Sequence, residues 1–428
     1  MKGRTIHVYC ARKTKRLHYT LRVIFTEWAN VPYTISHEYQ ANTDLEILDA
    51  EEAPRGAKSV KVRLVSDVLN DGQLVSEIPY TATPEFALFP VDEPGFERLD
   101  VISAVFWFIS RMEEQLLSTT RDAHGRFVFQ SSLLSKLGVS AKPWLEIWLI
   151  PLYEKLGISP ANKNSRSLGF DLDNAFVFKG KALYRRLGLA IKLGLKGDFR
   201  AFLAGFGIGK DPHDIYSFLK EQKPENQEWT FFIPVARRSE WDRNLDYSTR
   251  VYQELVRWLG GWAKIGVHLS YTSHQVDGGF KVEVDRLSGV LNKPVTKNRF
   301  HFLKQTLPMT WRKLESAGIQ EDYSLGFPDA MGFRAGVSWP FQPYDIGEER
   351  ILNLMVYPFV IMDEGLRGYQ NWTPEELGQL DVALPEYDSG ASQHRWVLHP
   401  DLMGGVFQWT GYAAAGKNLI QRISGRSI

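Results

Sequence analysis

The sequence predicts an α/β protein of two domains, a smaller N-terminal α+β domain over residues 1–160 and a larger domain over residues 161–428. Three observations support this prediction. A chain of 428 residues exceeds what one hydrophobic core usually organises. A polar stretch with turn-forming residues, SPANKNSRS at 159–167, separates the two parts. Beyond it, strand-like runs alternate with helical stretches, a rhythm typical of parallel βα units.

The N-terminal part begins with a predicted strand and a predicted helix. Residues 5–9 alternate in the manner of a strand, and residues 14–28 carry apolar side chains at helical spacing. A second alternating run at 59–64 predicts another strand. A further helix is expected at 143–156, just before the polar stretch.

Another N-terminal helix is predicted to begin at Asp100 and to end near Leu117. Its apolar positions recur at helical spacing, which indicates one buried face. Glu113 and Glu114 lie near its end, and we interpret them as part of a solvated acidic face.

The C-terminal part contains a series of predicted strands and helices. Helices are expected at 249–258 and 281–291. Strand-like runs occur at residues 168–173, 229–234, 264–268, 298–302, 331–335 and 354–358.

Composition limits the partners and the compartment. With 51 Lys plus Arg against 50 Asp plus Glu, the formal net charge of +1 gives no long-range field that nucleic acid or an anionic membrane would exploit. Cys10 is the only cysteine, so no internal disulfide forms and a reducing compartment fits. The N-terminus lacks a signal-peptide core, and the longest apolar run, 101–109, is too short to span a bilayer. We therefore expect a cytoplasmic protein with no membrane span and no nucleic-acid partner.

Polar side chains occur in pairs, two residues apart, at the ends of three predicted strands. The pairs are Asp171 with Asp173, His268 with Ser270, and Arg299 with His301. Side chains at i and i+2 point to one face of a strand. The strand ends of a βα barrel meet at one mouth. We therefore expect the three pairs to converge on one site.

The residue types in these pairs indicate a metal site. Two neighbouring carboxylates repel, and a shared proton, a cationic neighbour or a divalent metal relieves the repulsion. His268 and His301 supply nitrogen ligands for a metal. A carboxylate with two imidazoles suits Zn²⁺, and also Fe²⁺, Co²⁺ or Ni²⁺, acting as a Lewis acid that activates a water. A capping Asp or a structural His explains each motif when it is taken alone.

The segments that hold these residues are FDLDNA (170–175), GVHLSY (266–271) and NRFHFL (298–303). Together they resemble a divergent bacterial branch of the polysaccharide deacetylase (NodB homology, carbohydrate esterase 4-like) family. The resemblance implies a distorted (β/α) barrel of NodB type over 161–428. It also implies a metal-dependent hydrolase that removes acetyl groups from N-acetylated sugars or a glycan.

Other segments extend the resemblance over most of the chain. Two of them, SRMEE (110–114) and HGRF (124–127), resemble the accessory N-terminal domain found with this branch. The further segments similar to the branch are GIQEDYSLG (318–326), GFRAG (332–336) and WPF (339–341).

The resemblance assigns roles to the site residues. Asp171 is the catalytic base that takes a proton from the attacking water, and Arg299 holds it in its ionised form by a charge-assisted hydrogen bond. Asp173 is the first metal ligand and His268 the second.

The resemblance does not assign the third metal ligand directly, because the position that usually holds the other histidine, four residues after His268, is Thr272. We expect His301 to be the third ligand, since it shares a strand face with Arg299. His274 is the rival.

The last strand departs from the family pattern. The branch usually carries a Trp-His-Asn-like element here, whereas this chain has GGVFQWTGY at 404–412, with Thr410 in place of the histidine. A threonine hydroxyl has no useful pKa for general acid catalysis. His394 and His399 could replace that acid, but we place both on surface loops. Two hypotheses therefore remain: an active deacetylase, and a catalytically impaired barrel that binds a glycan or a protein.

Overall fold

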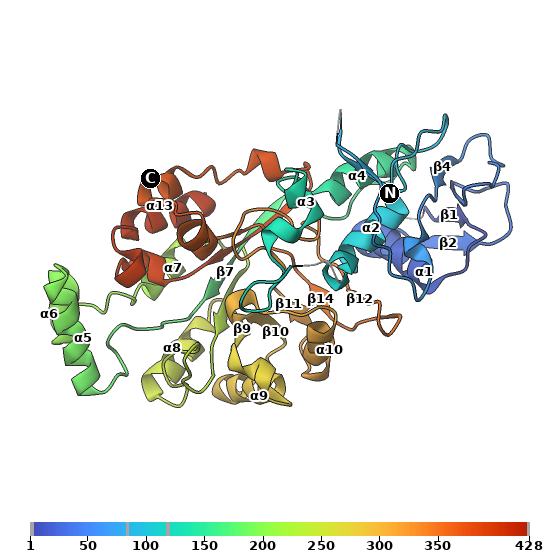
Figure 1. Cartoon of the computed structure of the whole chain (residues 1–428). Helices are drawn as coiled ribbons and strands as arrows, with labels where there is room; N and C mark the ends of the chain where they lie inside the picture. Colours follow the sequence, from blue (N-terminus) through green and yellow to red (C-terminus); the bar gives the residue numbers. More distant parts are fainter. Residues whose placement is uncertain (1–3, 83–84, 117–119, 426–428) are drawn as a thin grey trace.

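The computed structural model describes residues 4–82, 85–116 and 120–425, and its centre is an eight-stranded β-sheet (Figure 1). The strand order is β14-β11-β10-β9-β8-β7-β16-β15, and all neighbouring pairs are parallel. The strands are β7 (Ser165–Asp171), β8 (Trp229–Ile233), β9 (Lys264–Leu269), β10 (Lys297–Phe300), β11 (Glu321–Asp322), β14 (Met355–Val356), β15 (Ile361–Met362) and β16 (Gln393–Leu398). The predicted α/β class with parallel strands is confirmed.

The sheet curls without closing into a full barrel. Its two edge strands, β14 and β15, follow each other in the sequence, and the chain between them crosses from one edge to the other. The backbone N–H of Phe359 donates to the carbonyl of Leu325, and that of Val360 to the carbonyl of Arg395, both at 3.0 Å. These hydrogen bonds give the backbone N–H groups of the crossing segment their partners. The incomplete barrel agrees with the distorted barrel expected from the sequence.

Helices cover the sheet and bury apolar residues at helical spacing. In α8 (Arg250–Leu259) the buried residues are Tyr252, Leu255, Val256 and Leu259. Every residue of β8 is buried, as expected for a parallel strand covered on both faces. The helices predicted at 249–258 and 281–291 correspond to α8 and α9 (Gly279–Leu291). The other helices of this part are α5 (Leu183–Leu195), α6 (Phe199–Gly205), α7 (Tyr216–Gln222), α10 (Met309–Ser316), α11 (Pro374–Gln379), α12 (Asp401–Gly404) and α13 (Ala413–Ile423).

A second sheet lies in the N-terminal part, with the order β2-β1-β3-β4. All its pairs are parallel, so it differs from the expected α+β arrangement. The reason is that α1 (Lys15–Leu21), capped by Thr14, carries the chain back between β1 and β2, which makes a parallel crossover. The strands are β1 (Ile6–Tyr9), β2 (Tyr33–Ser36), β3 (Leu45–Leu48) and β4 (Val60–Arg63). The remaining N-terminal elements are β5 (Tyr80–Thr81), β6 (Ala87–Leu88), α2 (Val101–Ile109), α3 (Leu133–Lys136) and α4 (Trp144–Lys155).

The helix predicted from Asp100 ends earlier than expected. Asp100 caps α2 by accepting the N–H of Ser103, but α2 stops at Ile109. Arg111 then adopts a left-handed conformation with φ 54°, which an α-helix does not accommodate. Leu117, the predicted end, lies outside the described residues.

The expected solvated acidic face is wrong, because Glu113 and Glu114 are both buried. Glu114 forms ion pairs with Nε of Arg111 at 2.9 Å and with Nη2 of Arg334 at 2.6 Å. Burial raises the pKa of Glu114, but Arg334 and Arg111 outweigh it and lower the pKa to about 2. The pattern of charges around Glu114 in the sequence does not reveal that Arg334, far along the chain, lies beside it in the fold.

The strand predicted at 331–335 is also wrong. This segment is buried but irregular. Gly332 has φ 135° and Gly336 has φ 62°, values that an L-residue strand does not adopt. Arg334 between them makes the ion pair with Glu114, so the segment is shaped by a buried charge rather than by a strand ladder.

The N-terminal and C-terminal parts share one continuous hydrophobic core. Trp28 packs edge-on against Trp339, and its Nε1 donates to the carbonyl of Pro340 at 2.8 Å. The boundary near residue 160 therefore stays a prediction. Within the described part of the chain, none of the helices is both long and apolar enough to cross a bilayer.

Candidate metal centre

The candidate site residues meet at one edge of the large sheet. β7 ends at Asp171, β9 carries His268 next to its end, and Arg299 lies beside His268 in the β9–β10 register. Because the carboxyl ends of parallel strands share one edge, their side chains can line one cleft. The structure has such a cleft, of about 290 Å³, and the site residues that line it are Asp171, Asp173, His268 and His301.

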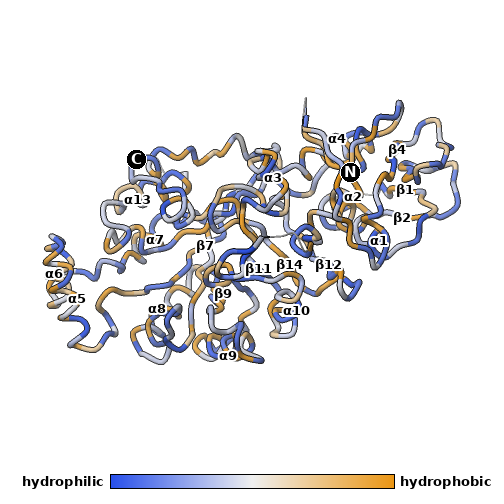
Figure 2. Tube along the Cα trace, viewed as in Figure 1, coloured by the Kyte–Doolittle hydropathy of each residue, from blue (hydrophilic) through white to orange (hydrophobic). Residues whose placement is uncertain are grey.

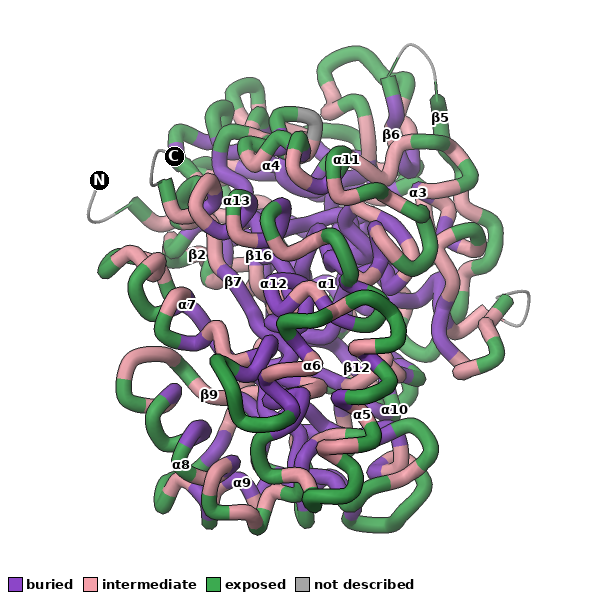
Figure 3. Tube along the Cα trace, turned by 90° about the vertical axis from the view of Figure 1, so that its left-hand side faces the viewer, coloured by how far each residue is buried: buried purple, intermediate pink, exposed green. Residues whose placement is uncertain are grey.

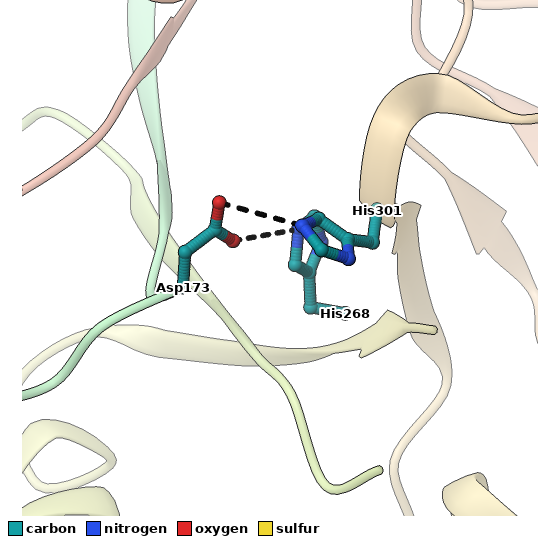
Figure 4. Close-up of side chains that lie close together, drawn as sticks. All are labelled: Asp173, His268 and His301. Atoms are coloured by element: carbon teal, nitrogen blue, oxygen red, sulfur yellow. Dashed lines mark ion pairs between the residues drawn. The ribbon is translucent and has the colours of Figure 1, made fainter. Parts of the chain in front are cut away.

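Asp173, His268 and His301 converge within this cleft (Figure 4). Oδ1 of Asp173 lies 3.2 Å from Nε2 of His268, and Oδ2 lies 3.5 Å from Nε2 of His301. Tetrahedral ligands about 2.0 to 2.1 Å from a zinc ion lie about 3.3 to 3.4 Å from one another. The spacing of the three side chains thus fits a shared metal ion, with at least one coordination position open.

The hydrogen bond made by Nδ1 of each histidine determines which of its two nitrogens can bind a metal. Nδ1 of His268 lies 2.9 Å from the carbonyl of Arg299, and Nδ1 of His301 lies 3.0 Å from Oδ1 of Asp242. Both partners are acceptors, so both Nδ1 atoms carry a proton and donate it. Nε2 of each histidine therefore faces Asp173 and is the nitrogen that would bind a metal, as in metal sites whose histidines donate Nδ1–H to an outer acceptor.

The charges of the cluster also favour a cation. Oδ1 of Asp173 is buried and accepts no hydrogen bond from the described residues. Burial raises the pKa of Asp173, but His301 and His268 outweigh it and hold the pKa well below its ordinary value. Burial lowers the pKa of His301, but Asp173 and Asp242 raise it to about 9. A proton or a divalent cation between these groups compensates the negative charge of Asp173, and the donor set fits the implied metal.

Asp171 is paired with Arg299 beside this cluster. Nη1 of Arg299 donates to Oδ1 of Asp171 at 2.9 Å, and its Nε donates to the carbonyl of Tyr323 at 3.0 Å. The guanidinium lies 4.2 Å from the ring centroid of Phe232. Both members of the pair are almost fully buried. Arg299 is thus held from three sides, and it positions the Asp171 carboxylate.

Gly169 makes room for that guanidinium. A Cβ on Gly169 would lie 2.5 Å from Nη1 of Arg299, far inside van der Waals contact. A glycine in the middle of a strand often marks such a close approach.

We expect Gly169→Ala to displace the Arg299 guanidinium and to lower the free energy of unfolding by about 1 to 3 kcal/mol, as overpacking does. Urea unfolding measures it. Gly188→Ala in α5 is the control, because nothing lies within 4 Å of its added Cβ, and it should raise stability by up to about 1 kcal/mol. Equal stability of the two variants would contradict the close approach.

His399 also lies in the cleft, so its expected place on a surface loop is wrong. It directly follows β16, whose carboxyl end shares the edge of the site. Its Nδ1 lies 2.7 Å from Oδ1 of the fully buried Asp363, and its Nε2 lies 3.8 Å from Oδ2 of Asp173. Burial lowers the pKa of His399, but Asp363 and Asp173 raise it well above the ordinary value.

Thr410, by contrast, does not belong to the described residues that line the cleft. The expectation that position 410 corresponds to the general acid of the site is therefore wrong. It is exposed, and its hydroxyl donates to the carbonyl of Phe407 at 2.8 Å. The neighbouring Trp409 lines the cleft instead.

The remaining histidine candidates lie elsewhere. His274 is half-buried, packs against the rings of Phe280 and Phe300, and lies outside the described lining of the cleft. Burial, with a contribution from Lys304, lowers its pKa to about 3. His394 is on β16 with Nε2 2.9 Å from the carbonyl of Tyr387. Of the two candidates for the third ligand, His274 and His301, the structure brings His301 close to Asp173.

The N-terminal part contributes to the cleft through Arg126. Its Nη1 donates to the carbonyl of Phe302 at 3.0 Å, and its Nη2 donates to the hydroxyl of Tyr369 at 2.8 Å. Phe302 and Leu303 both have positive φ, 60° and 52°, directly after His301. Such strain persists only where the surroundings hold it, and it often marks functional sites. Arg126 is one of the groups that hold this turn.

Residues 6–158 match a family of unknown function (DUF7033). No curated protein matches the chain. The part of the chain that contains the site is therefore not covered by that family.

Solved structures similar to the chain include a putative polysaccharide deacetylase from Mycobacterium smegmatis, at 15% identity, covering 61% of this chain and 84% of that one, with a TM-score of 0.38. A second is a putative polysaccharide deacetylase involved in O-antigen biosynthesis from Bordetella bronchiseptica, at 13% identity, covering 64% and 93%, with a TM-score of 0.33. A third is a family 4 carbohydrate esterase from Streptomyces lividans, at 11% identity, covering 62% and 88%, with a TM-score of 0.27. Similarity at this level leaves the function to be argued from the residues of the site.

Sequence reasoning missed two acidic residues of the site, Asp242 and Asp363. Both are buried and each holds the Nδ1 of a histidine, His301 and His399 respectively. Neither lies at a position two residues from another candidate. The signal that could have found Asp363 is its place directly after β15, at the same sheet edge.

Proposed function

We propose that this protein is a metal-dependent hydrolase that removes acetyl groups from N-acetylated sugars or a glycan. The observation that carries the proposal is the buried Asp171–Arg299 pair beside the Asp173–His268–His301 cluster, in one cleft with His399. A carboxylate base, a metal site and a proton donor are the groups that amide hydrolysis needs.

Each group has a role in this proposal. A divalent metal held by Asp173, His268 and His301 would act as a Lewis acid toward the acetyl carbonyl and the attacking water. Asp171 takes the proton of that water, and Arg299 orients the Asp171 carboxylate through its 2.9 Å hydrogen bond. His399, oriented by Asp363, gives a proton to the leaving nitrogen.

The lining of the cleft suits a saccharide. Trp241 and Tyr369 line the cleft and present exposed aromatic surface next to the polar cluster. Aromatic rings provide a flat apolar surface with a polar edge, on which sugar rings can stack. Arg126, which donates to the Tyr369 hydroxyl, holds one of these rings in place.

The test is acetate release from N-acetylated saccharides by the protein loaded with Zn²⁺, Co²⁺ or Ni²⁺. We expect metal-dependent release that Asp171→Asn lowers by about 10² to 10⁴-fold without loss of metal, because the base is not a ligand. Isothermal titration with the same saccharides tests the alternative, a glycan-binding module. Saccharide binding without acetate release under every metal would replace the hydrolase by that alternative.

A further inference from the structure

The hairpin formed by α5 and α6 projects from one end of the molecule, opposite the end that carries β1 to β4 (Figure 1). The two helices pack on each other so closely that a Cβ on Gly205 would collide with Ala190. A small cluster separate from the main core, which includes Val177 and Val406, ties the hairpin to the body. The hairpin is therefore a distinct element with its own packing.

Large apolar side chains of this hairpin are exposed. Apolar and polar residues are interspersed along both helices (Figure 2), and exposed and half-buried residues make up most of α5 (Figure 3). Leu195 is 85% exposed and Phe199 is 67% exposed, and they flank the turn between the helices. The other exposed apolar residues of the hairpin and its flanks are Leu183, Tyr184, Ile191, Phe206 and Ile208. Such a gathering of exposed apolar side chains marks an interaction surface.

The exposed residues form a continuous stripe rather than isolated points. Tyr184, Ile191 and Leu195 recur at i, i+7 and i+11 along α5, so they lie on one face. On α6, Phe202 stacks on Phe199 with ring centroids 5.9 Å apart. The interior of the hairpin is already filled by Ala190, Leu193, Ala201 and Ala204, so its fold does not require the stripe.

The charge of the segment is strongly positive, although the whole chain has a formal charge of only +1. Residues 179–210 contain eight Lys or Arg and a single acidic residue, Asp198. The exposed Arg185 and Lys192 of α5 and its C-cap residue Lys196 lie one residue after Tyr184, Ile191 and Leu195, so a basic stripe runs beside the apolar one. An amphipathic helix with Lys and Arg beside its apolar face is typical of attachment to an anionic membrane surface.

We propose that the α5–α6 hairpin docks the protein on an anionic lipid bilayer. Leu195 and Phe199 enter the boundary between headgroups and acyl chains, and Lys192 and Lys196 contact lipid phosphates. The positive charge of the hairpin favours an anionic bilayer over a second copy of the chain, because two copies of this segment would repel each other. The pocket beside α5 shares Gln408 with the candidate metal site, so docking would hold that cleft near the lipid surface.

The test is co-sedimentation of the full chain with two kinds of vesicle, phosphatidylcholine alone and an equal mixture of phosphatidylcholine and phosphatidylglycerol. We expect binding to the mixed vesicles, lowered by high salt and weak on phosphatidylcholine. Leu195→Ser with Phe199→Ser should weaken binding at least about tenfold, because two side chains no longer leave water. Lys192→Glu with Lys196→Glu should weaken it by a similar factor.

Matched controls carry the same kinds of change outside the hairpin. Leu74→Ser with Val276→Ser removes exposed apolar residues, and Lys13→Glu with Lys58→Glu reverses exposed charges. Circular dichroism and thermal unfolding verify that all variants fold. Two outcomes would overturn the proposal: equal binding by hairpin and control variants, and a dimer without vesicles that the hairpin variants dissociate.

Discussion

His268→Ala and Asp173→Asn are expected to lose the bound metal and to remain folded. Both residues lie at the carboxyl end of the sheet, and neither side chain belongs to the hydrophobic core. Replacing an outer partner of a ligand typically costs about 10 to 100-fold in metal affinity, so removing a ligand should cost more than about 100-fold. Acetate release should fall with the metal content.

Metal content after dialysis against a weak chelator, measured by atomic emission, tests this expectation. His301→Ala should also lower the metal content, because its Nε2 lies 3.5 Å from Asp173. His274→Ala is the matched control, since this histidine packs between two phenylalanines away from the cleft. Loss of metal from His274→Ala with retention in His301→Ala would move the site to the segment that follows His268.

The sequence was sufficient for the part of the site that follows from strand geometry. The pairs Asp171 with Asp173 and Arg299 with His301 lie at strand ends, and parallel strand ends share one edge of a sheet. Their convergence could therefore be expected without knowing the loops. Ser270 was paired with His268 by the same rule, but β9 ends at Leu269, and Ser270 instead bonds Glu283 of α9.

The sequence was not sufficient where a role depends on a distant partner. Glu114 has the pattern of a surface residue, but it is buried in ion pairs with the nearby Arg111 and the distant Arg334. The basic hairpin was hidden for another reason, since acidic residues elsewhere balance it and the total charge is +1. Neither the local sequence pattern nor the total charge of the chain shows which residues the fold brings together.

The proposed general acid, His399, shows this limit most clearly. The resemblance places a histidine-bearing strand around Thr410, but the strand that reaches the site is β16, and it ends directly before His399. Asp363, at the end of the neighbouring β15, orients that histidine by accepting from Nδ1 at 2.7 Å. The missing histidine at 410 therefore gives no reason to regard the protein as inactive.

His399→Ala is accordingly expected to lower the turnover of N-acetyl substrates by about 10² to 10⁴-fold, the usual contribution of general acid catalysis. Because an alkoxide leaves more readily than an unprotonated amine, O-acetyl esters should lose much less. Steady-state kcat for matched amide and ester substrates, at equal metal content, measures the difference. This contrast between substrates separates proton donation from a general loss of structure, which would lower both rates alike.

Asp363→Asn and Thr410→His complete the test of the general acid. Asp363→Asn keeps the shape but removes the charge beside His399, so it should lower amide turnover in the same direction and by a smaller factor. Thr410→His should leave turnover unchanged, because residue 410 is exposed and lies outside the described lining of the cleft. If His399→Ala slowed amides and esters equally while Thr410→His accelerated amides, the proton donor would lie on the segment around residue 410 and not at the end of β16.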